Sequence, residues 1–306
     1  MHSFFTIKHK SWRISMNLKD NQTFEEARQW ASFFLKENYQ TEVPALTYLL
    51  RLLDMSLTDY VKNKYDLISD EQRIYLNDAF HRIINHEPLE YIVGYRDFME
   101  RRFKVTKDTL IPREETSGII ELVLQLMDVN QSLNVIDIGT GTGILAITLK
   151  KMFPHFQVTA SDISLEALEI AKFNASYHDV QIKFHVSDVL KDVKPSNKFD
   201  VIVSNPPYIG HSEVEYMDQS VYLYEPKKAL FADENGLAII ERIMNESQQY
   251  LNTSGILIIE FGFKQADYVE TMARKYYPNA SINVHQDINQ IKRFISIMNK
   301  ESIHEN

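Results

Sequence analysis

Two patterns of apolar positions divide this chain. Up to about Asn85, apolar side chains recur every three or four residues, which is typical of amphipathic helices. Two capping boxes, Thr23 with Glu26 and Ser69 with Gln72, indicate where helices begin. The first part of the chain is therefore expected to form a small bundle of four short helices.

From Asn134 onward, short apolar runs alternate with helical segments, and this alternation predicts a parallel sheet. The expected strands are 134–138, 156–161, 182–186, 201–204, 256–261, 281–284 and 294–298. The connector between the last two is too short for a crossover helix, so these strands should be antiparallel neighbours. The fold class is α/β: a seven-stranded, mostly parallel, doubly wound sheet with an antiparallel last strand, preceded by the helical bundle.

Between these regions the sequence predicts a β-hairpin connector, with strands at 91–94 and 98–105 and a polar turn at 95–97. A helix is expected over about 115–127. The expected parts are a loosely held extension at 1–16, a helical domain at 17–86, a hairpin linker at 87–112 and the sheet domain at 113–306.

The composition narrows the class of protein. The 306 residues carry a formal net charge of −9, which argues against broad binding to nucleic-acid phosphates. The chain has no cysteine, so disulfides, thiolate metal sites and cysteine nucleophiles are excluded, and we expect no metal site. No apolar run approaches the length of a membrane span, and no targeting signal is evident, so we expect a cytoplasmic protein.

The stretch Asp200 to Ile209 holds the first candidate chemistry. A buried strand is predicted to end at Asn205, Pro206, Pro207 and Tyr208. Proline has no N–H, so the carbonyls here are acceptors that, with the Asn205 side-chain oxygen, suit a planar NH2 group lying against Tyr208. These residue types also form plain turns, so the four residues alone favour neither interpretation. The tetrapeptide resembles the catalytic motif of methyltransferases that modify such a nitrogen.

A glycine-rich turn follows the first strand of the predicted sheet. Its residues are Gly139, Thr140, Gly141, Thr142 and Gly143. The spacing Gly-x-Gly-x-Gly differs from the dinucleotide fingerprint, and there is no Gly-Lys-Ser/Thr as in a P-loop. Because glycine is otherwise costly, we expect the backbone to approach a ligand closely here. Opened by Asp137, the turn resembles the acid-x-Gly-x-Gly-x-Gly loop of class I S-adenosyl-L-methionine-dependent methyltransferases.

Two acidic residues come at the ends of the next two predicted strands. Asp162 is placed where an acid can accept hydrogen bonds from both hydroxyls of a ribose. In the family that the loop resembles, the position of Asp188 contacts the adenine amine, and the side chain at the position of Val189 packs near the ring. A lone Asp at a strand end is more often a helix cap or turn residue. Together with the glycine loop and Asn205, however, these residues agree along one edge of one sheet, so we expect them all to bind the cofactor.

The chain as a whole resembles the bacterial peptide-chain release factor glutamine methyltransferases over residues 23–298. The matching segments are Glu87-Pro88-Leu89-x-Tyr91-Ile92-x-Gly94 with Phe98 and Phe103, Leu110-Ile111-Pro112-Arg113, the glycine loop, Ser204 to Ile209, Glu225-Pro226, Ala229-Leu230, Gly236-Leu237, Glu260-x-Gly262-x-x-Gln265, and Asp287 with Arg293. Two positions depart from the family pattern, since Glu114 replaces a second Pro and Ser117 replaces a Glu. The segment 231–235 is also less glycine-rich than in the family.

The resemblance implies that the chain uses S-adenosyl-L-methionine to methylate the glutamine amide of the Gly-Gly-Gln motif in release factors, giving N5-methylglutamine. Asn205 and the Pro206 carbonyl would hold the two amide hydrogens, Tyr208 would fix the amide plane, and Pro207 would set the loop shape. The helical bundle and hairpin are then expected to dock the release factor onto a monomeric enzyme. We expect residues 209–233 to fold over the substrate; the alternative is a surface loop with partly buried tyrosines.

Two other functions stay open on the sequence. An N6-adenine or other exocyclic-amine methyltransferase acting on nucleic acid also uses Asn-Pro-Pro-Tyr, although the acidic charge and the lack of a target-recognition domain count against it. A module that binds S-adenosyl-L-methionine without activity is the other alternative. Labelling of a Gly-Gly-Gln protein discriminates among the three.

Overall fold

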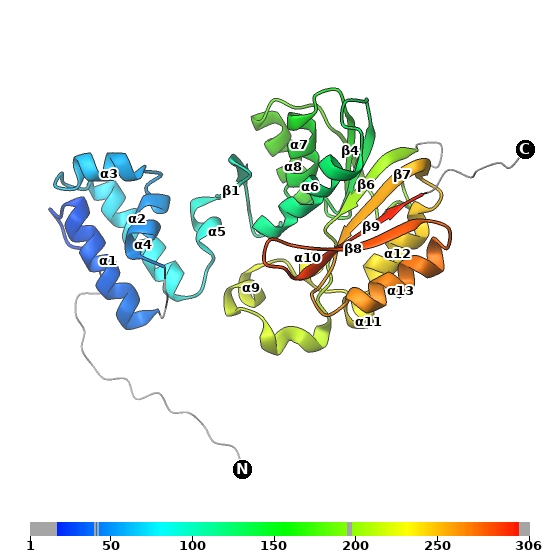
Figure 1. Ribbon diagram of the computed structural model, residues 1–306. Coiled ribbons are helices and arrows are strands. Elements are labelled where there is room, and N and C mark those ends of the chain that lie inside the picture. The colour runs from blue at the N-terminus through cyan, green and yellow to red at the C-terminus, as the bar shows by residue number, and fades with distance from the viewer. Residues whose placement is uncertain (1–16, 40, 42, 195–197, 300–306) are drawn as a thin grey trace, which may run out of the picture. The chain divides into compact units, whose positions relative to one another are not determined.

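A computed structural model describes residues 17–39, 41, 43–194 and 198–299. The expected extension at 1–16 lies outside the described residues. The chain divides into two compact units between Val93 and Gly94. Each is described by itself below, with the elements labelled in Figure 1.

The first unit is a helical bundle. Its helices are α1 (Phe24–Asn38), α2 (Ala45–Leu52), α3 (Leu57–Asn63), α4 (Asp70–Ile84) and α5 (Leu89–Val93). Both expected capping boxes are confirmed at the starts of α1 and α4. Aromatic rings form the centre of its core: Trp30 stacks on Phe34 with 4.9 Å between ring centroids, and Phe80 meets Trp30 edge-on at 5.1 Å.

The predicted hairpin is real, but its first strand was misplaced. Residues 91–94 do not form a strand, because α5 occupies Leu89–Val93 and Ile92 packs into the core of the helical bundle. The left-handed backbone of Gly94 (φ +82°) then ends the helix, as is common for a glycine just past a helix C-terminus. The hairpin consists of β1 (Tyr95–Phe98) and β2 (Arg101–Lys104), so the expected turn at 95–97 is a strand.

The second unit is the expected seven-stranded sheet. Its order is β5-β4-β3-β6-β7-β9-β8, and β9 runs antiparallel to both of its neighbours. The strands are β3 (Asn134–Ile138), β4 (Gln157–Asp162), β5 (Lys183–Val186), β6 (Phe199–Ser204), β7 (Leu251–Glu260), β8 (Ser281–Gln286) and β9 (Lys292–Met298). The largest difference in a strand boundary is at β7, which begins five residues before the expected start. The prediction missed these residues because Asn252 to Ser254 are polar and have the composition of a turn.

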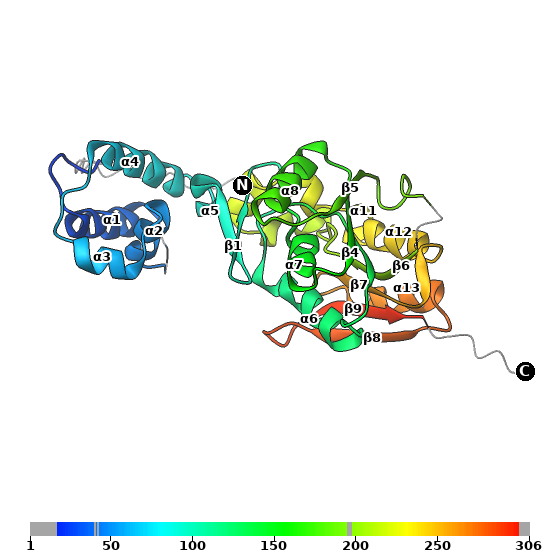
Figure 2. The same ribbon diagram turned by 90° about the horizontal axis from the view of Figure 1, so that it is seen from above.

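Helices cover both faces of this sheet (Figures 1 and 2). One face packs against α6 (Ser117–Leu126), α7 (Ile144–Met152) and α8 (Leu165–Tyr177), and the other against α12 (Ala238–Ser247) and α13 (Ala266–Tyr276). Neighbouring residues of one strand serve opposite faces: Val135 belongs to the first core and Ile136 to the second. The helix predicted over 115–127 is present in two parts: the short 3-10 helix η1 (Glu114–Thr116) leads directly into α6.

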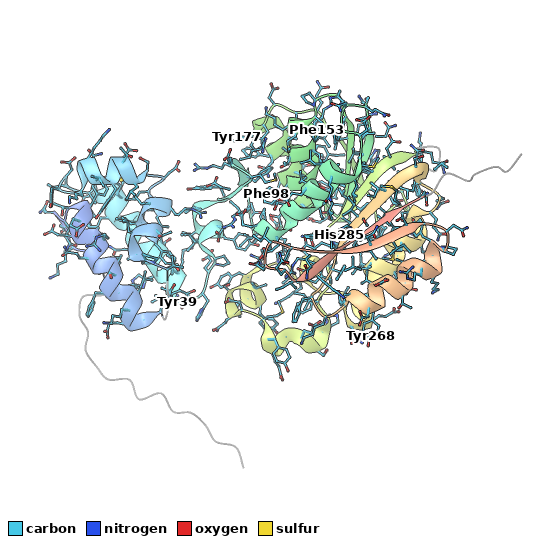
Figure 3. All side chains as sticks on the ribbon, viewed as in Figure 1. Tyr39, Phe98, Phe153, Tyr177, Tyr268 and His285 are labelled. Atoms are coloured by element: carbon cyan, nitrogen blue, oxygen red, sulfur yellow. The ribbon has the colours of Figure 1, made fainter. Side chains whose placement is uncertain are left out.

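Large aromatic side chains lie both inside and outside the second unit (Figure 3). Phe98 of β1 is buried, whereas Tyr177 of α8 and Tyr268 of α13 are exposed on the outer side of the helices. No helix among the described residues is long and apolar enough to cross a membrane.

The strand order places the candidate residues. It reverses between β3 and β6, so the carboxyl ends of β5, β4, β3 and β6 lie side by side at one edge. Ligands of open α/β sheets bind outside such a switch point.

Candidate active site

A cavity of about 820 Å³ opens at this edge of the sheet. Most of the residues expected from the sequence line it, namely Gly139, Thr140, Gly141, Thr142, Asp162, Asp188, Val189, Asn205, Pro206 and Pro207. Gly143 and Tyr208 do not. Gly143 begins α7, where an added Cβ would lie 2.8 Å from the Ile147 side chain, and Tyr208 packs against the core on the α12 and α13 face. The cavity is of the size that holds a small-molecule cofactor.

The glycine loop is bent by left-handed backbone. Gly139 and Gly141 have φ of +70° and +55°, values that side chains disfavour, and a Cβ at either would meet nothing within 4 Å. The amides of Gly139 and Thr140 donate to the Ser161 carbonyl at 2.8 and 2.9 Å, which ties the loop to the end of β4. Space for close approach to a ligand is therefore left beside two glycines.

Asp137 leaves one buried acceptor facing this loop. Its Oδ2 accepts hydrogen bonds from the Thr140 hydroxyl (2.6 Å) and the Ala146 amide (3.3 Å), whereas Oδ1 has no hydrogen-bond partner among the described residues. Burial raises the pKa of this carboxyl to about 7. A positively charged ligand group here would both satisfy Oδ1 and favour the charged carboxylate.

Asp162 lies at the end of β4 and is held by backbone. Its two oxygens accept the amides of Gly141 and Ser164, both at 2.9 Å, and burial raises its pKa. A carboxylate has about four acceptor positions, so two bonds leave acceptor capacity toward the cavity.

The turn after β5 is strained. Val189 has φ +60°, which is a true outlier for a β-branched residue. Side chains of α12 hold the residues on either side of it: Arg242 bonds the Asp188 carboxylate at 2.8 Å, and Glu246 accepts the Leu190 amide at 3.0 Å. Arg242 also pairs with Glu246 at 3.2 Å, so one linked group fixes the whole turn.

The Asn-Pro-Pro-Tyr loop is held from behind. Gln265 donates to the carbonyls of Tyr208 (2.8 Å) and Asn235 (2.9 Å). Gly236 lies so close that an added Cβ would be 1.9 Å from the Tyr208 carbonyl oxygen. The Ser204 hydroxyl donates to the Ile138 carbonyl at 2.7 Å and thereby joins the ends of β6 and β3.

An ion pair with a buried carboxylate holds Arg113, which lines the cavity. Glu225 accepts the Ile111 amide at 3.1 Å and the Arg113 guanidinium at 2.5 Å, and its side chain is 1% exposed. The two departures from the family pattern lie nearby in the chain. Glu114 pairs with Arg96 of β1 at 2.8 Å, which gives that departure a structural role.

The segment at 209–233 divides into two parts. His211, residues 226–229 and residues 231–233 line the cavity, whereas Tyr216 is 81% exposed. This placement is compatible with the expected cover over the substrate for the second half of the segment.

Sequence reasoning did not assign a role to three residues that support the site: Thr116, Arg242 and Glu260. Glu260 lies within a segment that matches the family pattern, which is the signal that singles it out. Thr116 lies between Glu114 and Ser117, the two positions that depart from that pattern. Arg242 has no such signal, because its partner Asp188 is 54 residues away in sequence.

The hydrogen-bond acceptors that line the cavity fit S-adenosyl-L-methionine. The ligand carries an ammonium, a ribose diol and an adenine amine, and the cavity offers the free acceptor of Asp137, the carboxylate of Asp162 and the carboxylate of Asp188. These three acids lie at or just after the carboxyl ends of three neighbouring strands of the sheet.

Comparisons with known proteins match both parts of the chain. A PrmC N-terminal domain model matches residues 26–94, and a methyltransferase small domain model matches residues 118–233. The release factor glutamine methyltransferase of Streptococcus pneumoniae is 38% identical over 80% of this chain and 88% of its own length. That of Lactococcus lactis is 40% identical over 75% of this chain and 84% of its own length.

A solved structure shows the same fold at low identity. The hMettl16 catalytic domain, in complex with a MAT2A 3′UTR hairpin, is 13% identical, with a TM-score of 0.51 over 85% of this chain and 95% of that one. The extent and identity of the matches to the curated relatives decide the family: this chain belongs to the release factor glutamine methyltransferases.

Proposed function

We propose that this protein transfers the methyl group of S-adenosyl-L-methionine to the side-chain amide nitrogen of the glutamine in the Gly-Gly-Gln motif of peptide-chain release factors. The product is N5-methylglutamine. The observation that carries the proposal is the placement of Asn205, at the end of β6, on the same cavity as the glycine loop.

The cofactor is held by residues at the strand ends. The glycine loop, Gly139 to Gly143, lies along the methionine part of the cofactor. Asp137 accepts a hydrogen bond from the ammonium group of the cofactor. Asp162 takes the ribose hydroxyls, and Asp188 and Val189 contact the adenine. When bound, the cofactor supplies a methyl group on a positively charged sulfur, which is a good leaving group.

The protein's contribution to the reaction is to orient the glutamine amide. An amide nitrogen is a poor nucleophile, because its lone pair is delocalised into the carbonyl. Asn205 and the Pro206 carbonyl accept the two amide hydrogens, so the nitrogen faces the methyl group in line. Pro207 sets the shape of the loop. Tyr208 does not line the cavity, so it fixes the plane of the amide indirectly, through the loop that Gln265 holds at the Tyr208 carbonyl.

The substrate protein needs a docking surface beyond the cavity. We assign this role to the helical bundle and the β1–β2 hairpin, with residues 226–233 covering the bound glutamine. The protein acts as a monomer, and direct binding to nucleic acid is not needed for this reaction.

The test is methyl transfer from labelled S-adenosyl-L-methionine to purified release factor, with a copy whose motif Gln is changed to Ala and with DNA and RNA as parallel acceptors. Label on the intact factor alone is expected. Label on nucleic acid, or equal label on both copies of the factor, would replace this proposal with the exocyclic-amine alternative. Cofactor binding with no transfer to any acceptor would favour an inactive module.

Asn205→Ala then tests the role of the loop. We expect kcat to fall by roughly 10²-fold to 10³-fold, as for removal of one oriented polar group in an active site, with a smaller effect on cofactor affinity. Asn130→Ala, which changes an exposed asparagine bonded only within its own turn, is the control. Near-normal turnover of the Asn205 variant would contradict the positioning account.

A further inference from the structure

Thr116 lies directly behind Asn205. It is the last residue of η1, it is fully buried, and it lines the cavity beside Asn205. The Asn205 side-chain NH2 donates to the Thr116 hydroxyl oxygen at 3.0 Å. These two residues are 89 positions apart, so only the fold brings them together.

One hydrogen bond to a hydroxyl does not by itself orient an amide. A hydroxyl both donates and accepts, so Thr116 alone would tolerate either end of the Asn205 amide. Orientation requires that the hydroxyl hydrogen be directed elsewhere.

Glu260 is the acceptor beside it. This glutamate, at the end of β7, is 1% exposed, and its Oε2 has no hydrogen-bond partner among the described residues. The neighbouring Thr116 hydroxyl lowers its pKa against the larger raising effect of burial. Tyr208, Arg293 and Glu115 also face it: Arg293 and the Tyr208 hydroxyl, 3.5 Å from Oε1, lower its pKa, and Glu115 raises it.

The direction of donation follows from this arrangement. Burial leaves the pKa of Glu260 at about 7, so above that pH its carboxylate only accepts hydrogen bonds. A Thr116 hydrogen directed to the unpartnered Oε2 of Glu260 leaves the Thr116 oxygen to accept from the NH2 of Asn205, and Oδ1 of Asn205 then faces the cavity.

We propose that Thr116 is a positioning residue that determines which end of the Asn205 amide faces the substrate. This role rests on the proposed function, in which Oδ1 accepts a hydrogen from the glutamine NH2. The reversed amide would set two NH2 groups against each other. Because neither could accept, the glutamine would be held poorly and the nitrogen would lose its alignment.

The test compares Thr116→Val with Thr116→Ser at pH 8, where Glu260 is charged. Valine keeps the shape of threonine and removes the hydroxyl, whereas serine keeps the hydroxyl. We expect Thr116→Val to lower kcat/KM for the release factor by about 10-fold to 50-fold, a typical cost of a misplaced reacting group. Thr116→Ser should stay within about threefold of wild type, and the Kd for S-adenosyl-L-methionine should change by less than about twofold in both, in line with a role confined to orientation.

Thr148→Val is a matched control. Thr148 is also fully buried, and its hydroxyl has no hydrogen-bond partner among the described residues, so its loss should leave kcat/KM unchanged. Glu260→Gln is a second variant. Its side-chain NH2 can donate to Thr116 and free the hydroxyl hydrogen to turn toward Asn205, so transfer should fall while cofactor affinity is kept.

The outcomes separate the two proposals. If wild type does not methylate the release factor, the proposed function fails. If wild type is active and Thr116→Val is equally active, only the role of Thr116 fails. Equal losses in the valine and serine variants would assign the effect to packing and would also overturn that role.

Discussion

The two units of this protein differ in what they bury. In the part of the chain that the structure describes, every buried Ser, Thr, Asn, Gln, Asp or Glu side chain lies after Val93, whereas the polar atoms in the core of the helical bundle are the hydroxyls of Tyr48 and Tyr60. Burying a polar group costs free energy unless it is well bonded. The bundle avoids most of that cost, because its core is mainly apolar and the buried Tyr60 hydroxyl donates to Glu25.

The second unit buries charged groups at the carboxyl edge of its sheet. Asp137, Asp162 and Glu260 are nearly fully buried, and burial raises the pKa of each. All three sit at or near the carboxyl ends of strands, around one cavity or behind it. Groups with shifted pKa values gather at functional sites. We therefore expect substitutions in the bundle core to change stability and substitutions at this edge of the sheet to change function.

Phe80→Ala should give the largest effect on stability and no effect on cofactor binding. Phe80 is fully buried among Trp30, Phe34 and Tyr48, and removing such a side chain costs about 3–5 kcal/mol. Both tryptophans of the chain precede residue 94, so urea unfolding followed by tryptophan fluorescence reports on the bundle.

Phe33→Ala is the control for this change, because Phe33 lies on the same bundle and is 46% exposed. Its unfolding midpoint should hardly move. A large loss of affinity for S-adenosyl-L-methionine in Phe80→Ala would break the comparison, since the bundle interior would then influence the cavity.

Asp137→Asn should stabilise the protein and weaken cofactor binding. The raised pKa means that the folded state holds the Asp137 proton more tightly than the unfolded chain does. Its contribution to stability is therefore complete below about pH 4 and is lost as pH rises through about 7. Asparagine has no proton to lose, so the variant should gain on the order of 4 kcal/mol at pH 8 and little near pH 4.

Thermal unfolding of wild type and variant across pH checks this sign, and calorimetric titration with S-adenosyl-L-methionine checks the loss of affinity. Asp128→Asn serves for comparison: that carboxyl is exposed, and hydrogen bonds from Gln131 and Asn130 lower its pKa, so no gain at pH 8 is expected. A gain in Asp137→Asn that does not depend on pH would reject the explanation by burial.

Arg242→Met should give the smallest effect of the three. It removes the guanidinium that ties Asp188 to Glu246 across the strained Val189 turn, so the turn should relax. We expect the Kd for S-adenosyl-L-methionine to rise about 5-fold to 10-fold, equivalent to about 1 kcal/mol, with little change in kcat.

Arg274→Met removes a similar exposed pair, with Glu270 on α13, and should leave the Kd unchanged. A Kd that is the same in both variants and wild type would mean that Asp188 and Val189 keep their geometry without Arg242.

Much of the fold was predictable from local patterns. Strong periodicity marked the strands of the sheet, and capping residues marked α1 and α4, because both signals depend on nearest neighbours in the chain. The segment at 91–94 shows the limit. Its β-branched residues favoured a strand, but packing of Ile92 in the bundle core favours α5.

The candidate site divides in the same way. Residue order alone placed Gly139 to Gly143, Asp162 and Asn205 at strand ends, since parallel strands bring their carboxyl ends to one edge. The contacts of Thr116 with Asn205, of Arg242 with Asp188 and of Glu225 with Arg113 join residues 54 to 112 positions apart. Which side chain meets which over such distances depends on packing, so these contacts were decided only when the chain folded.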